Sequence, residues 1–531
     1  MKLRYLSSLL RTTVATTLIV SASLSASIGC NQQENSTNTT PQQIKINSIR
    51  MIYPPEARTL MSGAVQRFNA KNAQVANGSI IRLSASSFDD LAGVDKIGTP
   101  QAPASLWIAP LSSMAAGFAK GSQPDSTLTD CASVMSSALG VSYRPIDRFA
   151  LPSDPSQITM QSVMERPAGP STYKLAVVTG SPRFTSSGLL AALATVSFET
   201  STPLQSLTSD TISNGQDRIR NSQSSIRNYF ISDFDTLNWI NDRQGGEPLV
   251  ALTTEQSFKE HQRYTPQTTL EWSRTNSPAV ALDYPVCTIS SKSDSSQDLE
   301  SVKAVRDFLG GKEFQEMVAS SGFAPALDEN VANPQVGLAA RTLLSLWPQI
   351  RRPSMTVFVL DASIKTDRPT METIRREVKM FIESRPSQTD SVALISASSN
   401  PEILSEPQVS AELLNIALNK ISTTGGNAIR DGIQTAFTLF ADLTSNNYRR
   451  SVVVFTSSKD TSSQTSITQL TNRATQLVGR KNVDLFVIAL GASNADFGEL
   501  PDLTKEVGGT FIRSSLASLP SDFFPIARRI Q

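Results

Sequence analysis

The C-terminal third of this 531-residue chain contains short, almost continuously apolar runs that alternate with amphipathic stretches. The run at 357–360 reads Val-Phe-Val-Leu, and the run at 452–454 reads Val-Val-Val. Strands without a polar face are typical of parallel sheets that helices cover on both sides. In the stretch 371–383, apolar residues recur at i, i+4, i+7 and i+8, which is helical spacing. This alternation predicts a doubly wound, mostly parallel α/β sheet over residues 350–531, with a site at the carboxyl ends of its strands.

The same periodicity gives the expected position of each element. Strands are expected at 356–361, 391–397, 451–455, 483–490 and 510–512. Helices are expected at 371–383, 411–421, 427–444, 467–478 and 520–530. Residues 343–354, which contain two prolines, are expected to be a short linker at most.

Polar residues follow several of the apolar runs. In one known family, the residues at the corresponding positions bind a metal ion. Asp361 ends the first run two residues before Ser363, Asn427 follows a Gly pair, and Ser457 follows a late strand. This order resembles the von Willebrand factor A (VWA) domain, whose adhesion site reads DxSxS, then Thr, then Asp. Here Lys365 stands in place of the second Ser, Asn427 in place of Thr, and Ser457 in place of Asp. The resemblance implies that these five residues converge at one end of the sheet.

The changed residues predict a degenerate site without a metal. Mg²⁺ prefers near-octahedral oxygen ligands, and only Asp361 and Ser363 keep the family's identity. Lys365 adds a cation that would repel a divalent ion. We therefore expect no cofactor, with Lys365 paired to Asp361 in the place of the metal. The alternative is that Asp460 supplies a substitute carboxylate and restores Mg²⁺ binding.

The preceding part, residues 44–340, also alternates between strands and helices. Its first strands are expected at 44–53, 79–85 and 104–110. This order resembles the first lobe of type 2 periplasmic solute-binding proteins. A polar loop at 181–189, the Asp-Tyr-Pro at 283–285 and the Gly-Phe-Ala-Pro-Ala at 322–326 extend the resemblance. The resemblance implies a two-lobed domain with a ligand cleft.

The resemblance directs polar residues of both lobes towards that cleft. The residues expected to line it are Tyr53, Ser84, Ser112, Thr185, Ser186, Ser187 and Tyr284. The loop 181–189 leads into a helix, whose free amide hydrogens and positive dipole end favour an anion or a carbonyl group. The alternative is that Thr185 or Ser186 only caps this helix. The expected ligand is an unidentified small solute or anion.

The first 43 residues have the composition of an export signal followed by a tether. Three basic residues precede a mostly apolar stretch at 14–28. The Ser-Ile-Gly-Cys at 27–30 resembles a lipobox, which implies that 1–29 is a lipoprotein signal peptide and that Cys30 carries a lipid. Residues 30–43 have no large apolar side chain and are expected to be flexible. We therefore expect a lipid-anchored protein of the periplasm or cell surface; a plain secretory signal is the alternative.

The remaining cysteines and the charge narrow the chemistry further. Cys131 and Cys287 are compatible with a disulfide or with two buried thiols. On the solute-binding scheme each lies near a crossing between the lobes, which favours the disulfide. His261 is the only histidine, so metal clusters built on His are excluded. A formal net charge of +1, or −2 without the leader's three basic residues, gives no reason to expect nucleic acid as a partner.

Together these features predict an exported, non-catalytic binding protein. The sequence contains no GxSxG elbow, no phosphate-binding loop and no zinc-ligand spacing. The solute-binding-like part is expected to hold a small ligand, and the VWA face is expected to bind a protein. The alternative is a surface adhesion or envelope-assembly factor in which the solute-binding fold is only a scaffold.

Overall fold

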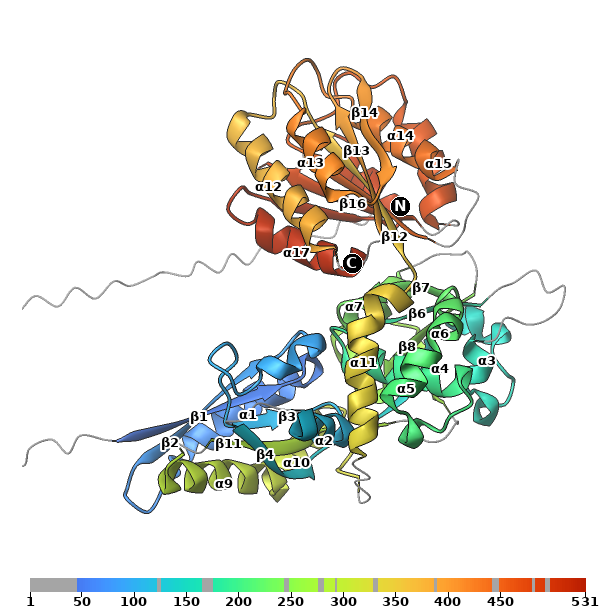
Figure 1. Cartoon of the computed structure of the whole chain (residues 1–531). Helices are drawn as coiled ribbons and strands as arrows, with labels where there is room; N and C mark the ends of the chain where they lie inside the picture. The colour runs from blue at the N-terminus through green and yellow to red at the C-terminus, as the bar shows by residue number, and fades with distance from the viewer. Residues whose placement is uncertain are drawn as a thin grey trace, which may run out of the picture. The chain divides into compact units, whose positions relative to one another are not determined.

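The computed structural model describes eleven stretches of the chain. These are residues 45–121, 126–164, 175–242, 248–275, 281–291, 294–327, 333–385, 389–441, 448–479, 483–491 and 497–531. Cys30, the expected lipid site, lies outside them. No helix within these stretches is long and apolar enough to cross a lipid bilayer. The described residues form three β-sheets with accompanying helices (Figure 1).

The first sheet belongs to the first lobe of the N-terminal half and has the strand order β2-β1-β3-β11-β4. Its strands are β1 (Ile46–Tyr53), β2 (Ile80–Ser87), β3 (Leu106–Ile108), β4 (Ser126–Ser133) and β11 (Pro285–Ser291). Its helical segments are η1 (Pro55–Ala57), α1 (Arg58–Ala70), η2 (Leu91–Lys96), α2 (Ser112–Gly121), α9 (Ser296–Gly310) and α10 (Lys312–Ser320). β1 runs parallel to β2 and β3, so these strands end at a common edge.

The second sheet belongs to the second lobe and has the order β10-β5-β8-β6-β7, with β9 paired to β5. Its strands are β5 (Ser137–Tyr143), β6 (Ala176–Gly180), β7 (Ile226–Phe230), β8 (Leu249–Thr254), β9 (Glu271–Arg274) and β10 (Ala281–Leu282). Its helical segments are η3 (Pro145–Ala150), η4 (Pro155–Gln157), α3 (Met160–Met164), α4 (Ser186–Glu199), η5 (Leu204–Ser206), α5 (Ser209–Asn214), α6 (Gln216–Gln223), α7 (Asp233–Asn241) and α8 (Glu255–Tyr264). β6 runs parallel to β7 and β8.

The two cysteines lie beside the points where the chain crosses between the lobes. Cys131 of β4 and Cys287 of β11 are joined by a disulfide bond, with their Cα atoms 4.1 Å apart. β4 and β11 pair antiparallel within the first sheet. The bond therefore ties two strands of one lobe next to the crossings that precede β5 and follow β10.

The expected linker at 343–354 is mostly helix. It forms the second half of α11 (Pro334–Ile350), which packs against α2 of the first lobe and against α5 and α6 of the second (Figure 1). A Cβ atom on Gly337 would lie 2.0 Å from the backbone oxygen of Ser113, so α11 and α2 approach each other at a glycine. The linker prediction was wrong because an amphipathic helix tolerates Pro348 in its last turns.

The connection from α11 to the third sheet is buried. Arg351 forms an ion pair with Asp390, and both side chains are almost fully enclosed. Asp390 also accepts a hydrogen bond from the backbone N–H of Ser354 at 2.7 Å. The chain thus enters the C-terminal domain through a packed junction.

The third sheet has the order β14-β13-β12-β15-β16-β17. Its strands are β12 (Ser354–Asp361), β13 (Ser391–Ala397), β14 (Pro401–Gln408), β15 (Arg449–Thr456), β16 (Val483–Leu490) and β17 (Thr510–Ser514). Its helical segments are α12 (Arg368–Ser384), α13 (Ala411–Asn419), α14 (Ile429–Ala441), α15 (Ile467–Ala474), the π-helical turn η6 (Thr475–Gly479), α16 (Leu500–Glu506) and α17 (Leu519–Ile530). All neighbouring strands are parallel except β14, which pairs antiparallel with β13.

Both faces of this sheet are covered, as the apolar runs predicted. Val357 and Val359 pack into one core with α14, α15 and α16. Phe358 and Leu360 pack into another with α12, α13 and α17 (Figure 1). Successive residues of a strand point to opposite faces, so a strand between two helical layers needs apolar residues at every position. The prediction of a doubly wound, mostly parallel sheet is confirmed.

Candidate functional site

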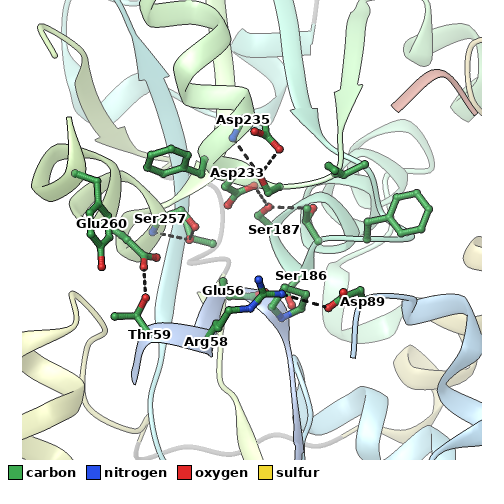
Figure 2. Close-up of a pocket in the computed structure, with 18 of the residues that line it drawn as sticks. Glu56, Arg58, Thr59, Asp89, Ser186, Ser187, Asp233, Asp235, Ser257 and Glu260 are labelled. Carbon is green, nitrogen blue, oxygen red and sulfur yellow. Dashed lines mark hydrogen bonds and ion pairs between the residues drawn. The ribbon is translucent and has the colours of Figure 1, made fainter. Parts of the chain in front are cut away.

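A cavity of about 390 Å³ lies between the two lobes of the N-terminal half. β1 and β2 of the first lobe and β6, β7 and β8 of the second lead into the loops and helix starts that line it. Because parallel strands end at one edge, the segments that follow them face a common space. Figure 2 shows the polar side chains that project into this space from both lobes.

The first lobe contributes residues from the turn after β1 and from the loop after β2. Glu56 lies in η1, Arg58 and Thr59 begin α1, and Asp89 follows β2 (Figure 2). The Tyr284 hydroxyl group donates a hydrogen bond to Oε1 of Glu56 at 2.9 Å. The Glu56 carboxyl group is therefore positioned by Tyr284, which lies in the crossing between β10 and β11.

The second lobe contributes the loop that starts α4 and the first turn of α7. Thr185 caps α4, because its Oγ1 accepts the Gly188 N–H at 3.0 Å. The Ser187 hydroxyl group donates to Oδ1 of Asp233 at 2.5 Å. A Cβ atom on Gly188 would lie 2.2 Å from the carbonyl oxygen of Gly180, so only glycine allows this turn to close.

Polar contacts join the two lobes across the cavity. Nε and Nη2 of Arg183 donate to the two carboxylate oxygens of Asp90, each at 2.9 Å. Burial alone would raise the pKa of Asp90, but these hydrogen bonds hold it below its usual value. The Thr59 hydroxyl group donates to Oε1 of Glu260 at 2.9 Å. Side-chain contacts thus connect the two lobes in the region of the cavity.

Two carboxyl groups of the cavity are poorly compensated. Burial raises the pKa of Glu56 to about 7, although the hydroxyl groups of Ser186 and Tyr284 act in the opposite direction. Burial also raises the pKa of Asp233 against the hydrogen bond from Ser187. Carboxylates in a low-dielectric environment bind protons more tightly unless a cation or several N–H groups stabilise the charge. With a pKa of about 7, the Glu56 carboxyl group is therefore partly protonated near neutral pH.

The charges that line the cavity are mostly acidic. They are the carboxyl groups of Glu56, Asp89, Asp233, Asp235 and Glu260 against the guanidinium groups of Arg58 and Arg528. Arg528 comes from α17 of the C-terminal domain, and its guanidinium carbon lies 4.7 Å from the centre of the Phe184 ring. An anion in this space would meet more negative than positive groups.

Three of the seven side chains expected at the cleft line the cavity, namely Thr185, Ser186 and Ser187. Tyr284 reaches it only through Glu56. Tyr53 is buried at the end of β1 and is not part of the lining. Strand residues alternate between the two faces of a sheet, and this alternation places its ring in the core.

The other two expected residues also lie away from the cavity. Ser84 is exposed in the middle of β2, which continues to Ser87 rather than ending at 85 as expected. Ser112 starts α2, where its N–H donates to Oδ1 of Asp283 at 2.8 Å. A side chain of the second crossing therefore takes the place that a ligand was expected to occupy.

The acidic residues of the cavity were missed. The strands that precede them, β1, β7 and β8, contain apolar runs. Glu56, Asp233 and Glu260 come after these strands in the sequence. Position after a strand was an available signal for Glu56 and Asp233, because such residues gather at the site edge of a parallel sheet, whereas Glu260 lies inside α8. The solute-binding resemblance implies hydroxyl groups at these loops, and the acidic residues fall outside that pattern.

The second candidate site lies at the carboxyl ends of β12 and β15 in the C-terminal domain. Oδ2 of Asp361 accepts hydrogen bonds from the Asn427 amide at 3.0 Å, the Thr456 hydroxyl at 3.1 Å and the Ser457 N–H at 2.9 Å. Oδ1 accepts the N–H of Ser363 at 3.0 Å. Four of the five expected residues or their backbone therefore meet here, and Thr456 is an additional contributor.

Lys365 does not join them. Its side chain is exposed, and among the described residues it forms no ion pair with Asp361. The buried neighbour Thr366 instead turns inward, with its Oγ1 2.7 Å from the Ser457 hydroxyl oxygen. The prediction of a Lys365–Asp361 pair was wrong because amide and hydroxyl donors already stabilise the Asp361 carboxylate.

The oxygen groups at this site differ from the set of charged ligands that Mg²⁺ prefers. Asp361 is the one carboxylate present, and its oxygens already accept several hydrogen bonds. The Ser363 hydroxyl and the Asn427 carbonyl oxygen are buried without hydrogen-bond partners among the described residues, but both are neutral. Asp460 is held elsewhere, because it pairs with Arg430 at 3.2 Å. No group of three or more His, Cys, Asp or Glu in the described stretches could hold a metal.

Comparison with known protein families identifies the C-terminal domain. Residues 356–523 match the family model of the von Willebrand factor type A domain. No curated protein matches the chain. The C-terminal domain is therefore a VWA domain, a type found in protein-interaction and adhesion proteins.

Several solved structures resemble parts of the chain. The sulfate-binding protein SubI from Mycobacterium tuberculosis H37Rv is 16% identical with a TM-score of 0.35, over 54% of this chain and 88% of that one. BatB from Bacteroides thetaiotaomicron is 14% identical with a TM-score of 0.27, over 33% of this chain and 97% of that one. The VWF domain of the pili tip protein Mfa5 from Porphyromonas gingivalis is 12% identical with a TM-score of 0.27, over 34% and 96%. At such identities, likeness concerns the fold alone.

Proposed function

We propose that the protein is an exported, non-catalytic binding protein, anchored by a lipid on Cys30, that takes a small solute between its two lobes. The observation that carries this proposal is the cavity of about 390 Å³ lined by the strand ends of both lobes. Its size is in the range of small-molecule sites, and it combines convergent polar groups with carboxyl groups of raised pKa.

The VWA domain supplies the second half of the proposal. We propose that it binds a protein partner through the surface around Asp361 without a metal ion. The absence of a metal ion is supported by the hydrogen bonds at Asp361. N–H and hydroxyl groups donate to the carboxylate oxygens that would otherwise coordinate the ion. Calorimetry of the purified protein with Mg²⁺ and Mn²⁺ is expected to give no saturable heat. Micromolar binding that Asp361→Ala abolishes would overturn this part.

A direct test of the solute-binding proposal is a thermal-shift screen of the purified protein with sodium sulfate, glucose, amino acids and small organic amines. At least one compound is expected to raise the melting temperature in proportion to the logarithm of its concentration. The double variant Ser187→Leu and Thr254→Leu, which fills the cavity, should abolish the shift. No response to any class would count against solute binding.

The adhesion or assembly alternative is favoured by a specific observation as well. Arg183–Asp90, Thr59–Glu260 and the packing of α11 on both lobes give the N-terminal half the fixed form that a scaffold needs. On this alternative, the cavity-filled variant would retain every partner interaction of the wild-type protein. Pull-down with the wild-type and cavity-filled proteins from the same envelope extract separates the two functions.

The lipid anchor is tested independently of both. Metabolic labelling with a palmitate analogue is expected to mark the wild-type protein and not Cys30→Ser. Equal labelling of the two proteins would remove the anchor from the proposal and leave the binding sites untouched.

A further inference from the structure

The carboxyl groups of the cleft divide into a paired end and an unpaired end. Nη2 of Arg58 lies 4.0 Å from Oδ1 of Asp89 and donates to the Ser87 hydroxyl at 3.1 Å. Arg528 lies near the same end, because Asp90 and Asp89 raise its pKa against the lowering effect of burial. Arg58 therefore lies beside Asp89, and Arg528 lies near enough to interact electrostatically with Asp89 and Asp90.

The other four carboxyl groups, those of Glu56, Asp233, Asp235 and Glu260, form no ion pair within the described part of the chain. Their partners are hydroxyl, amide and backbone groups, such as Tyr284 on Glu56 and Ser187 on Asp233. Figure 2 shows them around one space. Once the pH exceeds the pKa of about 7 of Glu56, this end of the cleft carries carboxylate charge that no cation among the described residues pairs with.

Aromatic rings lie beside the unpaired carboxyl groups. Phe234 and Tyr264 both line the cavity, with exposed fractions of 38% and 56% and ring centres 6.4 Å apart. Burial lowers the pKa of His261, which lies under Phe234, so no imidazolium cation competes at this face. Ring faces attract cations, and this attraction is strongest where water is partly excluded.

A buried hydroxyl group also faces the Glu56 carboxyl group in the cavity. Ser186 is 1% exposed, and among the described residues its Oγ meets no group with hydrogen-bond geometry. It lies close enough to Glu56 to lower the pKa of that carboxyl group. Its lone pairs are therefore available to an N–H donor that enters the cleft.

We propose, on the basis of the proposed solute-binding function, that the cleft selects a small organic ammonium ion and rejects inorganic oxyanions. The ammonium group lies among Glu56, Asp233 and Glu260, with Ser186 as an acceptor and the rings of Phe234 and Tyr264 at its apolar side. An ammonium ion offers three N–H donors or a methylated apolar surface, and both fit this combination of acceptors and rings.

The N-terminal end of α4 does not contradict this selection. Helix N-termini attract anions, but here the protein supplies its own: Asp233 lies at the first turn of α4 through the Ser187 hydroxyl. The Gly188 N–H is already taken by Thr185. A sulfate ion would have to compete with Asp233 for the remaining donors, at short distance from a like charge.

The test is isothermal titration of the purified protein at pH 8 with choline chloride, butane-1,4-diamine dihydrochloride, sodium sulfate and glucose. We expect at least one of the two ammonium compounds to bind and the sulfate not to bind. Asp233→Asn and Glu260→Gln should each weaken that binding by about tenfold or more. The matched control Glu271→Gln removes one exposed carboxylate outside the cavity and should change the affinity by less than about twofold.

The possible outcomes distinguish the selection for ammonium ions from the proposed solute binding in general. Binding of sulfate or glucose with no response to either ammonium compound overturns the selection for cations and leaves solute binding intact. Ammonium binding that Glu260→Gln and Glu271→Gln weaken equally overturns the assignment to the cleft. No binding by any of the four compounds overturns the ammonium inference, and the wider solute screen then decides the proposed function. Glu260 is only partly buried, so its variant remains informative if Asp233→Asn does not fold.

Discussion

Replacing Glu56 by Gln is expected to stabilise the protein at alkaline pH and to change little in acid. Burial raises the pKa of this carboxyl group from 4.5 to about 7 in the folded protein. Between these two pH values the folded protein holds a proton that the unfolded chain has released. The stability contributed by Glu56 is therefore complete below about pH 4.5 and is lost as the pH rises through 7.

The magnitude follows from the same difference in pKa. It corresponds to about 3 kcal/mol once both states are ionised, and partial solvent access reduces the expectation to about 2 kcal/mol. Gln is close in size and keeps an oxygen that can accept the Tyr284 hydroxyl bond. The groups that face Glu56 are Ser186, Tyr284 and Asp233, and none of them is a cation. The variant thus removes the charge and little else.

The assay is urea unfolding of the wild-type and variant proteins at pH 4.5 and pH 8.5, followed by tryptophan fluorescence. All four tryptophans lie before residue 350, so the signal reports the N-terminal half. The control Glu271→Gln should shift neither curve by more than about 0.5 kcal/mol. A variant that is equally stabilised at both pH values, or destabilised at pH 8.5, would refute the argument that burial of an uncompensated carboxylate sets this pKa.

Three other changes have definite expected effects. Cys131→Ser opens a covalent loop of 156 residues to Cys287, and the unfolding free energy should fall by up to about 5 kcal/mol; a curve equal to that of the oxidised wild type would exclude the bond. Gly337→Ala should cost about 1 to 3 kcal/mol by overpacking α11 on α2, whereas Gly310→Ala, with open space around its Cβ, should be neutral or stabilising in the same melt. Lys365→Ala should change the melting temperature of the VWA domain by less than about 2 °C, and a larger drop would restore its pairing with Asp361.

The sequence predicted elements that repeat a simple pattern. The buried strands β12, β15 and β16 were visible because a parallel strand between two layers of helices is apolar at every position. β14 was not expected, since Pro401–Gln408 contains two prolines and two glutamates. Such a composition is tolerated on an edge strand, where one row of backbone groups needs no partner. Pairing with β13, rather than local composition, therefore determines that these residues form a strand.

The site residues were harder to predict because loops have no period. Asp361 could be placed, since it ends a strand of known register. Whether Lys365 or Thr366 turns inward depends on the path of the loop over α12 and α14, and a shift of one residue exchanges an exposed cation for a buried hydroxyl group. The predictions that Tyr53 and Ser84 line the cleft were wrong for a related reason. Placing such a residue requires both the last residue of its strand and the face of the sheet to which its side chain points.

The two sites of this protein differ in how their carboxyl groups are stabilised, and this difference bears on where a ligand acts. At the VWA site, Asp361 receives hydrogen bonds from an amide, hydroxyl groups and backbone N–H groups, so the folded chain itself compensates its charge. In the cleft, burial raises the pKa values of Glu56 and Asp233 in spite of the hydrogen bonds that they accept. A buried charge without compensation destabilises the fold unless a proton or a ligand neutralises it. Cation binding in the cleft would therefore stabilise the protein, whereas a cation added to the VWA site would first have to displace bonds that already exist.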